Sequence, residues 1–307
     1  MKFICISDIH LTADNPIARL DNLIETQFKK LEWILNLAKK ENATILQAGD
    51  IFNKPRSWML LPMVIDLLKK YNVDIYCVRG QHDDYMYSEQ TRERTNLGIL
   101  EKVGLIHPLS EEPTTIRDIV ISGANFGQNL VDIKRSTFTV GVIHTSVSQT
   151  ALWPDHKFTP ADEFLAKHTC YDFILVGDIH RQFEAIGEDG RRLVNTGPML
   201  RSEATEYNFD HQPSVFLLDT DNIENSTWIA IPHEKSSVVL SRDHIERKAE
   251  AEGMLDEFVA SLKEGADQIE GVSFVENLVK FIKDNSVEKP VSDVLARFIE
   301  KVNREGI

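Results

Sequence analysis

The chain has 307 residues, of which 42% are hydrophobic and 27% are charged, and its net charge is −14. This composition is that of an ordinary globular protein with room for one large domain and an appendage, and no apolar run reaches the roughly 18 residues that a membrane-spanning helix needs. The acidic balance excludes a protein that holds nucleic acid by its global charge alone, although bound divalent metals or a partner can supply positive charge locally.

Short aliphatic runs alternate with segments of helical periodicity in the first part of the chain. The following segments read as strands: residues 2–7, 43–48, 74–79, 117–124, 136–144, 171–180, 214–222 and 226–232. Amphipathic helices are expected at 23–38, near 58–70 and near 160–167, the last capped by Thr159 with Pro160 at its first position. Residues 182–195 read as a hairpin that turns at Asp189–Gly190. Strand–helix–strand order with short joints predicts parallel pairing and a layered α/β sheet.

The character of the sequence changes at about residue 235. Three charged amphipathic segments follow, near 242–264, 273–285 and 290–303, separated by a glycine-containing stretch and by Pro290. We therefore predict two domains, an α/β domain over residues 1–234 and a small, mostly helical region over residues 235–307.

The N-terminus and the cysteines predict the compartment. The first ten residues lack the long apolar core and the small-residue cleavage site of a signal peptide. Cys5, Cys77 and Cys170 are odd in number and far apart, and each lies in an apolar run, which is typical of reduced core thiols. We expect a cytoplasmic protein with no membrane association.

Several of the predicted strands end in residues that ligate metals or transfer protons. In chain order these are Asp8 and His10; Asp50; Gln81, His82 and Asp83; His144; and Asp178 and His180. Because ligands bind at the carboxyl ends of strands in parallel α/β sheets, we expect these side chains to converge on one edge. Asp8–His10 alone would be read as a turn and His144 alone as a partly buried histidine, so the prediction rests on their joint order.

Metal ions explain why so many acidic groups would converge. Asp8, Asp50 and Asp178 would repel one another and raise each other's pKa unless cations neutralised them. Mixed carboxylate and imidazole ligands suit Mn²⁺, Fe²⁺ or Zn²⁺, whereas Mg²⁺ prefers oxygen-only sites. Two metals roughly 3.5–4 Å apart form a clamp for in-line attack on phosphorus.

The order D-x-H, G-D, G-x-H-D, H and G-D-x-H resembles the pattern DxH…GD…GNH[DE]…H…GHxH of the calcineurin-like metallophosphoesterase superfamily, over about residues 1–232. The resemblance implies a four-layer α/β/β/α sandwich, with the small helical region appended. Within the superfamily, "GDIFNKPR" at 49–56 and "NTGPMLRSEATE" at 195–206 are most similar to the nuclease subunit of SbcCD-type DNA repair complexes.

The resemblance also implies a role for each residue. One metal, expected to be Mn²⁺ with Mg²⁺ as the alternative, would be held by Asp8, His10, Asp50 and His180. Asp50 would bridge to a second metal that is held by Gln81, His144 and Asp178. His82 would donate to the phosphoryl or leaving oxygen in the transition state, and Asp83 would orient its ring. Gln81 and Asp178 depart from the family pattern, which has Asn and His at these positions.

The function implied is a metal-dependent DNA nuclease of DNA repair or recombination, exonucleolytic on duplex ends and endonucleolytic on single strands. It would act in a bacterial, phage-infected or archaeal cell, as a homodimer formed through the region of the first two helices, beside an SMC-like ATPase. Apolar faces that would dock this ATPase, or pack on the protein's own domain or a second copy, contain Phe274, Leu278, Phe281, Ile282, Val294, Leu295, Phe298 and Val302. The alternatives are a small-molecule phosphodiesterase or phosphatase and a catalytically weak scaffold subunit.

Overall fold

The computed structural model describes residues 1–134, 137–250, 253–254, 274–285, 287, 289, 291–293 and 295–297. The chain divides into two compact units, Met1–Ser241 and Arg242–Ile307. The short helix α6 (Ser236–Val239) belongs to the first unit, where Val239 and Leu240 pack on Ala18 and Ala204.

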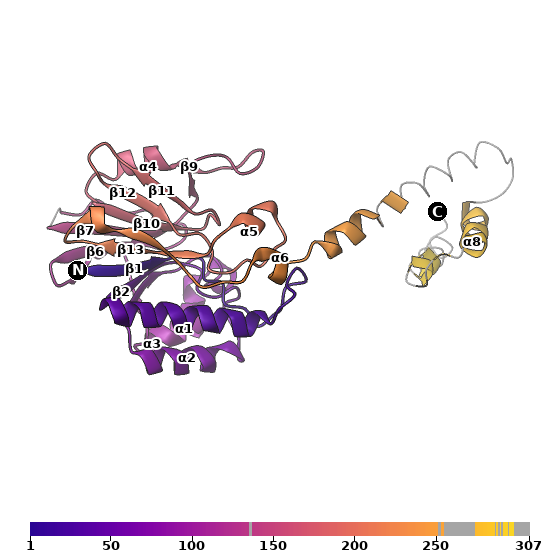
Figure 1. Cartoon of the computed structure of the whole chain (residues 1–307), viewed down its shortest axis with the longest axis horizontal. Coiled ribbons are helices and arrows are strands. Elements are labelled where there is room, and N and C mark those ends of the chain that lie inside the picture. Colours follow the sequence, from indigo (N-terminus) through magenta and orange to yellow (C-terminus); the bar gives the residue numbers. More distant parts are fainter. Residues whose placement is uncertain are drawn as a thin grey trace. The chain divides into compact units, whose positions relative to one another are not determined.

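The first unit contains two six-stranded sheets (Figure 1). The strand order of the first sheet is β14 (Thr227–Ala230), β13 (Ser214–Asp219), β1 (Lys2–Ile6), β2 (Thr44–Ala48), β3 (Ile75–Val78) and β4 (His107–Pro108). Strands β1 to β4 run parallel, and β13 and β14 close the sheet in antiparallel pairing. The parallel strands at 2–7, 43–48 and 74–79 are thus confirmed.

Helices α1 (Leu23–Glu41), α2 (Leu60–Tyr71) and α3 (Asn96–Lys102) cover the outer face of this sheet (Figure 1). Helix α1 begins where Asn22 Oδ1 accepts a hydrogen bond from the backbone N–H of Glu25, and it ends at Asn42 in the left-handed conformation. The spacing of Leu31, Ile34 and Leu35 places one apolar face on the sheet.

The second sheet has the order β11 (Phe183–Ile186), β12 (Arg192–Asn195), β10 (Phe173–Gly177), β7 (Phe138–His144), β6 (Ile119–Ala124) and β5 (Thr114–Ile116). Its four central strands are parallel, and β11 and β5 are antiparallel edges. The β11–β12 hairpin turns through Gly190, whose φ of 82° suits glycine, as predicted.

Helix α4 (Ala161–Lys167) packs on the outer face of the second sheet through Phe164 and Leu165. The prediction that Thr159 caps this helix is wrong. Thr159 lies in β9 (Thr159–Pro160), which pairs with β8 (Val147–Ser148), and its backbone N–H is bonded to Ser146 O. Pairing with β8 holds Thr159 in a strand, so the helix starts at Ala161, one residue later than predicted.

The two sheets face each other across a core that includes Phe3, Leu46, Phe173 and Phe216. Successive side chains of a strand point to opposite faces, so Phe3 and Cys5 lie between the sheets while Ile4 and Ile6 pack under the helices. The predicted α/β/β/α sandwich is confirmed.

Smaller elements of the first unit are the helix α5 (Glu206–Asp210) and the 3₁₀ segments η1 (Tyr85–Tyr87), η2 (Glu89–Arg94) and η3 (Ile223–Asn225). In the second unit the described residues include helical positions 243–250 and the helix α8 (Phe274–Asp284), where Leu278 is buried. The predicted apolar residues Val294, Phe298 and Val302 lie outside the described residues. Among the helices that the structure describes, none is long and apolar enough to cross a membrane.

Candidate metal centre

The carboxyl ends of five parallel strands bring the predicted site residues to one edge of the sandwich. Asp8 and His10 follow β1, Asp50 follows β2, His82 follows β3, His144 ends β7, and Asp178 and His180 follow β10. The ligand atoms of all of these except Asp178 form three overlapping groups, each with all atoms within 4.8 Å of one another: Asp8, His10 and His180; His10, Asp50 and His82; and Asp8, Asp50 and His144. Residues up to 172 positions apart thus meet in one site, as the strand ends predict.

The backbone at this edge is left-handed at residues other than glycine. The φ angles are 50° at Asp8, 49° at His10, 56° at Asp50 and 98° at Asp178. Such conformations cost about 1–3 kcal/mol each and persist where surrounding contacts hold them. Here the backbone N–H groups of Asp8 and His10 bond to the carbonyls of Gly49 and Asp50, at 3.1 and 2.9 Å. Strain concentrated on predicted ligands is typical of a functional site.

Two glycines allow the loops to approach this closely. A Cβ atom on Gly49 would lie 2.2 Å from His144 Nδ1, and one on Gly80 would lie 2.0 Å from Asp50 Oδ1. The glycines before Asp50 and Gln81 are therefore required by packing around the site, in addition to the turn that the sequence suggests.

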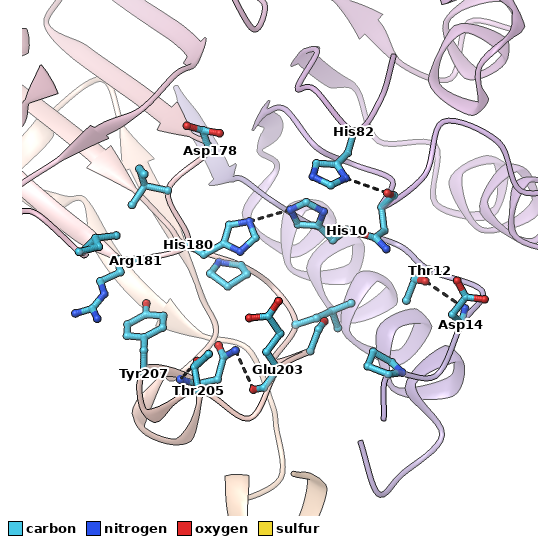
Figure 2. A pocket seen from close by; sticks show the side chains of 18 of the residues that line it. His10, Thr12, Asp14, His82, Asp178, His180, Arg181, Glu203, Thr205 and Tyr207 are labelled. Atoms are coloured by element: carbon cyan, nitrogen blue, oxygen red, sulfur yellow. Dashed lines mark hydrogen bonds between the residues drawn. The ribbon is translucent and has the colours of Figure 1, made fainter. Parts of the chain in front are cut away.

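His10 and His180 lie against Asp8 on one side of the site. The Nε2 atoms of the two rings are 2.9 Å apart, and His180 Nε2 is 3.7 Å from Asp8 Oδ1 (Figure 2). Burial lowers the pKa of His10 to about 3, so its ring is neutral and has a lone pair for a cation. This neutral state is the one in which imidazole ligates metals.

Asp50 and His144 form the buried centre of the site. His144 Nδ1 donates to the carbonyl of Ala48 at 2.6 Å, which directs Nε2 toward Asp50 Oδ2 at 3.4 Å. Burial opposes both charges, but each group favours the charge of the other: the pKa of Asp50 is lowered to about 2 and that of His144 is raised to about 10. Without a metal, a proton on His144 therefore balances the carboxylates.

Gln81 and Asp178, the two departures from the family pattern, contact each other. Gln81 Nε2 donates to Asp178 Oδ1 at 2.8 Å, and the same carboxylate oxygen is 3.9 Å from His144 Nε2. The pair thus lies on the His144 side of the site, where the second metal is expected.

His82 and Asp83 differ from the prediction in how they are connected. The ring of His82 is oriented by the carbonyl of Asn53, 3.0 Å from Nδ1. Asp83 is buried and accepts hydrogen bonds from the backbone N–H groups of Asp50, Ile51, Phe52 and Gly80. Burial, then the Asp50 charge, raise its pKa to about 7, although the hydrogen bonds from the backbone of Phe52 and Gly80 act to lower it. Asp83 was predicted to orient the His82 ring. Instead, its hydrogen bonds hold the backbone of the Asp50 loop.

The residues present fit divalent cations. The buried atoms of the predicted ligands that have no hydrogen-bond partner within the described part of the chain include Asp8 Oδ2, Asp50 Oδ2, Gln81 Oε1 and His144 Nε2. An unsatisfied buried polar atom costs about 1–3 kcal/mol, so a cation that these atoms share would remove a large penalty. Their mixture of carboxylate, amide and imidazole suits Mn²⁺, Fe²⁺ or Zn²⁺.

The site opens into a cavity of about 630 Å³ (Figure 2). His10, His82, Asp178 and His180 line it, together with four residues that the sequence did not single out: Trp153, Arg181, Glu203 and Tyr207. Arg181 directly follows the G-D-x-H segment, which is the one sequence signal that would have indicated it. The others come from loops whose placement depends on tertiary packing.

A cluster of carboxylate and imidazole side chains with cation-ligating geometry, at the strand ends of an α/β/β/α sandwich, defines a candidate site for divalent cations. The sequence profile of the calcineurin-like phosphoesterases matches residues 1–182, more than half of the chain. The protein belongs to this family.

Other comparisons give weaker likenesses. A dimetal phosphatase from Danio rerio is 12% identical, with 76% of this chain and 97% of that chain covered and a TM-score of 0.48. A 5′-nucleotidase from Candida albicans is 11% identical, with 75% and 52% covered and a TM-score of 0.45. Zn²⁺-complexed Vps29 from Entamoeba histolytica is 14% identical, with 76% and 100% covered and a TM-score of 0.37. None of the curated proteins compared with the sequence matches it. These likenesses indicate no substrate.

Proposed function

We propose that this phosphoesterase is a two-metal phosphodiesterase that acts as a DNA nuclease, on duplex ends and on single strands. The observation that carries the phosphodiesterase activity is the convergence of the predicted ligands, with their unsatisfied atoms, beneath one open cavity. Two divalent cations, Mn²⁺ in the first place and Mg²⁺ as the alternative, would activate the attacking water and neutralise charge on the phosphoryl group.

The protein's own residues would position the two cations and supply a proton. Asp8, His10, Asp50 and His180 would hold one cation, and Asp50, Gln81, His144 and Asp178 the other. His82 lies at the base of the cavity with its Nδ1–H on the carbonyl of Asn53. Its Nε2 therefore carries a proton only when the ring is an imidazolium, and in that form it can donate to a phosphoryl or leaving oxygen.

The nuclease activity and its partners are argued from charge and resemblance. A net charge of −14 opposes tight binding of DNA by the isolated chain. We infer that an SMC-like ATPase clamps the DNA and that two copies of this chain act together, in DNA repair or recombination. The C-terminal helical segments are the region that we assign to the ATPase.

The test is Mn²⁺-dependent digestion of end-labelled duplex and single-stranded DNA, with bis(p-nitrophenyl) phosphate as a small ester. We expect all three to be cut, with EDTA abolishing cleavage and His82→Ala slowing it strongly. The matched control is His107→Ala, because His107 is outside the cavity and its side chain is only half-buried. If the small ester is hydrolysed while the DNA stays uncut, with the ATPase present as well, the proposed nuclease activity would be rejected and the proposed phosphodiesterase activity would stand.

The size of the cavity favours a second candidate, a small-molecule phosphodiesterase or phosphatase. A volume of about 630 Å³ is within the range of roughly 300–1,000 Å³ found for small-molecule sites. Under this alternative, nucleotides and sugar phosphates are turned over while DNA is not. A panel of phosphomonoesters and cyclic nucleotides, assayed beside the DNA substrates, separates the two candidates.

A further inference from the structure

One wall of the cavity presents an arginine that is held ready for an anion. The guanidinium of Arg181 lies 4.9 Å from the centre of the Tyr207 ring, and the side chain is exposed. Tyr207 is itself fixed, because its hydroxyl accepts from the backbone N–H of Gln182 at 2.9 Å and lies 3.1 Å from His211 Nδ1. In the part of the chain that the structure describes, no carboxylate pairs with Arg181. Its charge is therefore available to a ligand.

A second wall presents an aromatic surface. Trp153 lines the cavity and is 56% exposed, and its ring packs on that of His156 with centroids 4.0 Å apart and the two planes tilted by 36°. His156 stacks in turn on Phe158 at 4.8 Å, and its Nδ1 accepts from the backbone N–H of Leu152. These packed rings hold the indole in place, while part of its surface stays open to the cavity.

These features restrict what the cavity can accept beside the scissile phosphate. A carboxylate on the same cavity, that of Glu203, disfavours an anion close to it, whereas Arg181 favours one (Figure 2). Figure 2 shows Arg181 and Tyr207 on one side of His180, with Thr12 and Asp14 on the other. A flat aromatic group on Trp153 together with an anion on Arg181 is the chemistry of a nucleotide unit, in which a base and a phosphate are joined through a sugar.

We propose that Trp153 and Arg181 form a nucleotide subsite, in which the indole stacks on a base and the guanidinium binds the phosphate next to the scissile one. The inference rests on the proposed phosphodiesterase function, because it places the subsite beside the metal centre. It goes beyond that function in naming the recognised group as an unpaired base. A base in a duplex has both of its surfaces covered, so the subsite selects single-stranded or frayed ends.

The experiment is a fluorescence-anisotropy titration in EDTA, which prevents cleavage, using a labelled oligothymidylate and an abasic strand of the same length. We expect the wild type to bind the base-bearing strand more tightly than the abasic one. Trp153→Ala should weaken binding of the base-bearing strand about five- to a hundredfold and leave the abasic strand unchanged. Trp153→Phe should restore most of the difference. Arg181→Ala should weaken both strands and reduce the salt dependence of binding.

Matched controls separate the subsite from general effects. Trp58 is 88% exposed and does not line the cavity, so Trp58→Ala should bind both strands as the wild type does. Unlabelled thymidine 5′-monophosphate should compete through Trp153, and its potency relative to the oligonucleotide tells whether a free nucleotide or a strand end is the ligand. Equal affinity of the wild type for the two strands, or equal loss in Trp58→Ala, would overturn the subsite. If the wild type did not hydrolyse bis(p-nitrophenyl) phosphate, the proposed function would be overturned instead, so the two failures are distinguishable.

Discussion

The side-chain amide of Gln81 donates a hydrogen bond of 2.8 Å to Oδ1 of Asp178, two residues separated by 97 positions. They are the two positions at which the chain departs from the pattern of its family, and the structure makes them direct neighbours. The Gln81 amide reaches the Asp178 carboxylate directly, and the Gln81 carbonyl oxygen remains buried without a partner among the described residues. The two residues are therefore expected to act as one unit at the second metal position.

The exchange Gln81→Asn with Asp178→His tests this coupling. Each single variant should lower the affinity for the second Mn²⁺ by about 10- to 100-fold, because each loses the mutual hydrogen bond. The double variant should recover much of that loss and shift preference toward Zn²⁺, since it replaces an oxygen ligand by nitrogen. Titration calorimetry with Mn²⁺ and Zn²⁺ measures both effects. Strict additivity, within about 0.5 kcal/mol, would show that the residues act independently.

His82→Ala should slow hydrolysis by about 10²- to 10⁴-fold, with little change in Mn²⁺ affinity. The Nδ1–H of His82 is bonded to the Asn53 carbonyl, so donation from Nε2 requires the imidazolium. The defect should also be larger for a DNA phosphodiester than for p-nitrophenyl esters, whose leaving group needs no proton. Equal defects on both would rule out the proton-donor role.

Asp83→Asn should destabilise the fold and weaken metal binding together. The carboxylate accepts four backbone N–H bonds, from Asp50, Ile51, Phe52 and Gly80, and an amide has one oxygen for them. Leaving buried donors unpaired should lower the free energy of unfolding by about 2–4 kcal/mol. Urea unfolding with and without Mn²⁺ measures the change. A loss of rate with unchanged stability and metal affinity would instead support the predicted role of orienting His82.

Metal binding should release a proton at neutral pH. Asp50 raises the pKa of His144 to about 10 although burial lowers it, so the ring is charged in the metal-free protein. The Nδ1–H is held by the Ala48 carbonyl, and the proton that a cation displaces is the one on Nε2. Calorimetry in buffers of different ionisation enthalpy counts the protons. About one per protein is expected below pH 9, and none in His144→Asn.

Lys30 should make stability depend on pH. Its ammonium group is buried in α1 and donates to the carbonyl of Met199, and burial, with Arg201 and Arg19 nearby, lowers its pKa to about 7. Between pH 7 and 10.5 the unfolded state binds the extra proton, so this group makes the free energy of unfolding rise with pH, by up to about 1.4 kcal/mol per pH unit. Lys30→Met should flatten this slope in urea titrations at a series of pH values. Parallel slopes for the two proteins would contradict the assignment.

The layered α/β sheet and the residues that its strands carry to one edge could be predicted from the sequence pattern, whereas the four-layer sandwich followed from the resemblance to the family. Strand period and strand ends are local properties, so Asp8, Asp50, His144 and Asp178 could be located before any fold was known. Helix starts were less predictable: Thr159 has the chemistry of a cap, but pairing between β8 and β9 places it in a strand. Local preference is overridden where a neighbouring segment supplies a better set of hydrogen bonds.

How the site residues are connected, and what surrounds them, depends on tertiary contacts that the sequence pattern does not show. Asp83 follows His82 directly, yet it supports the Asp50 loop, and a carbonyl of that loop orients His82 in its place. The contact of Gln81 with Asp178 and the shared cavity of Trp153 and Arg181 likewise join segments far apart in the chain. The direction of a side chain beyond a strand end is set by the backbone angles of its loop and by the segments packed on it. Those angles, left-handed at Asp8, His10, Asp50 and Asp178, are fixed by contacts that exist only in the folded chain.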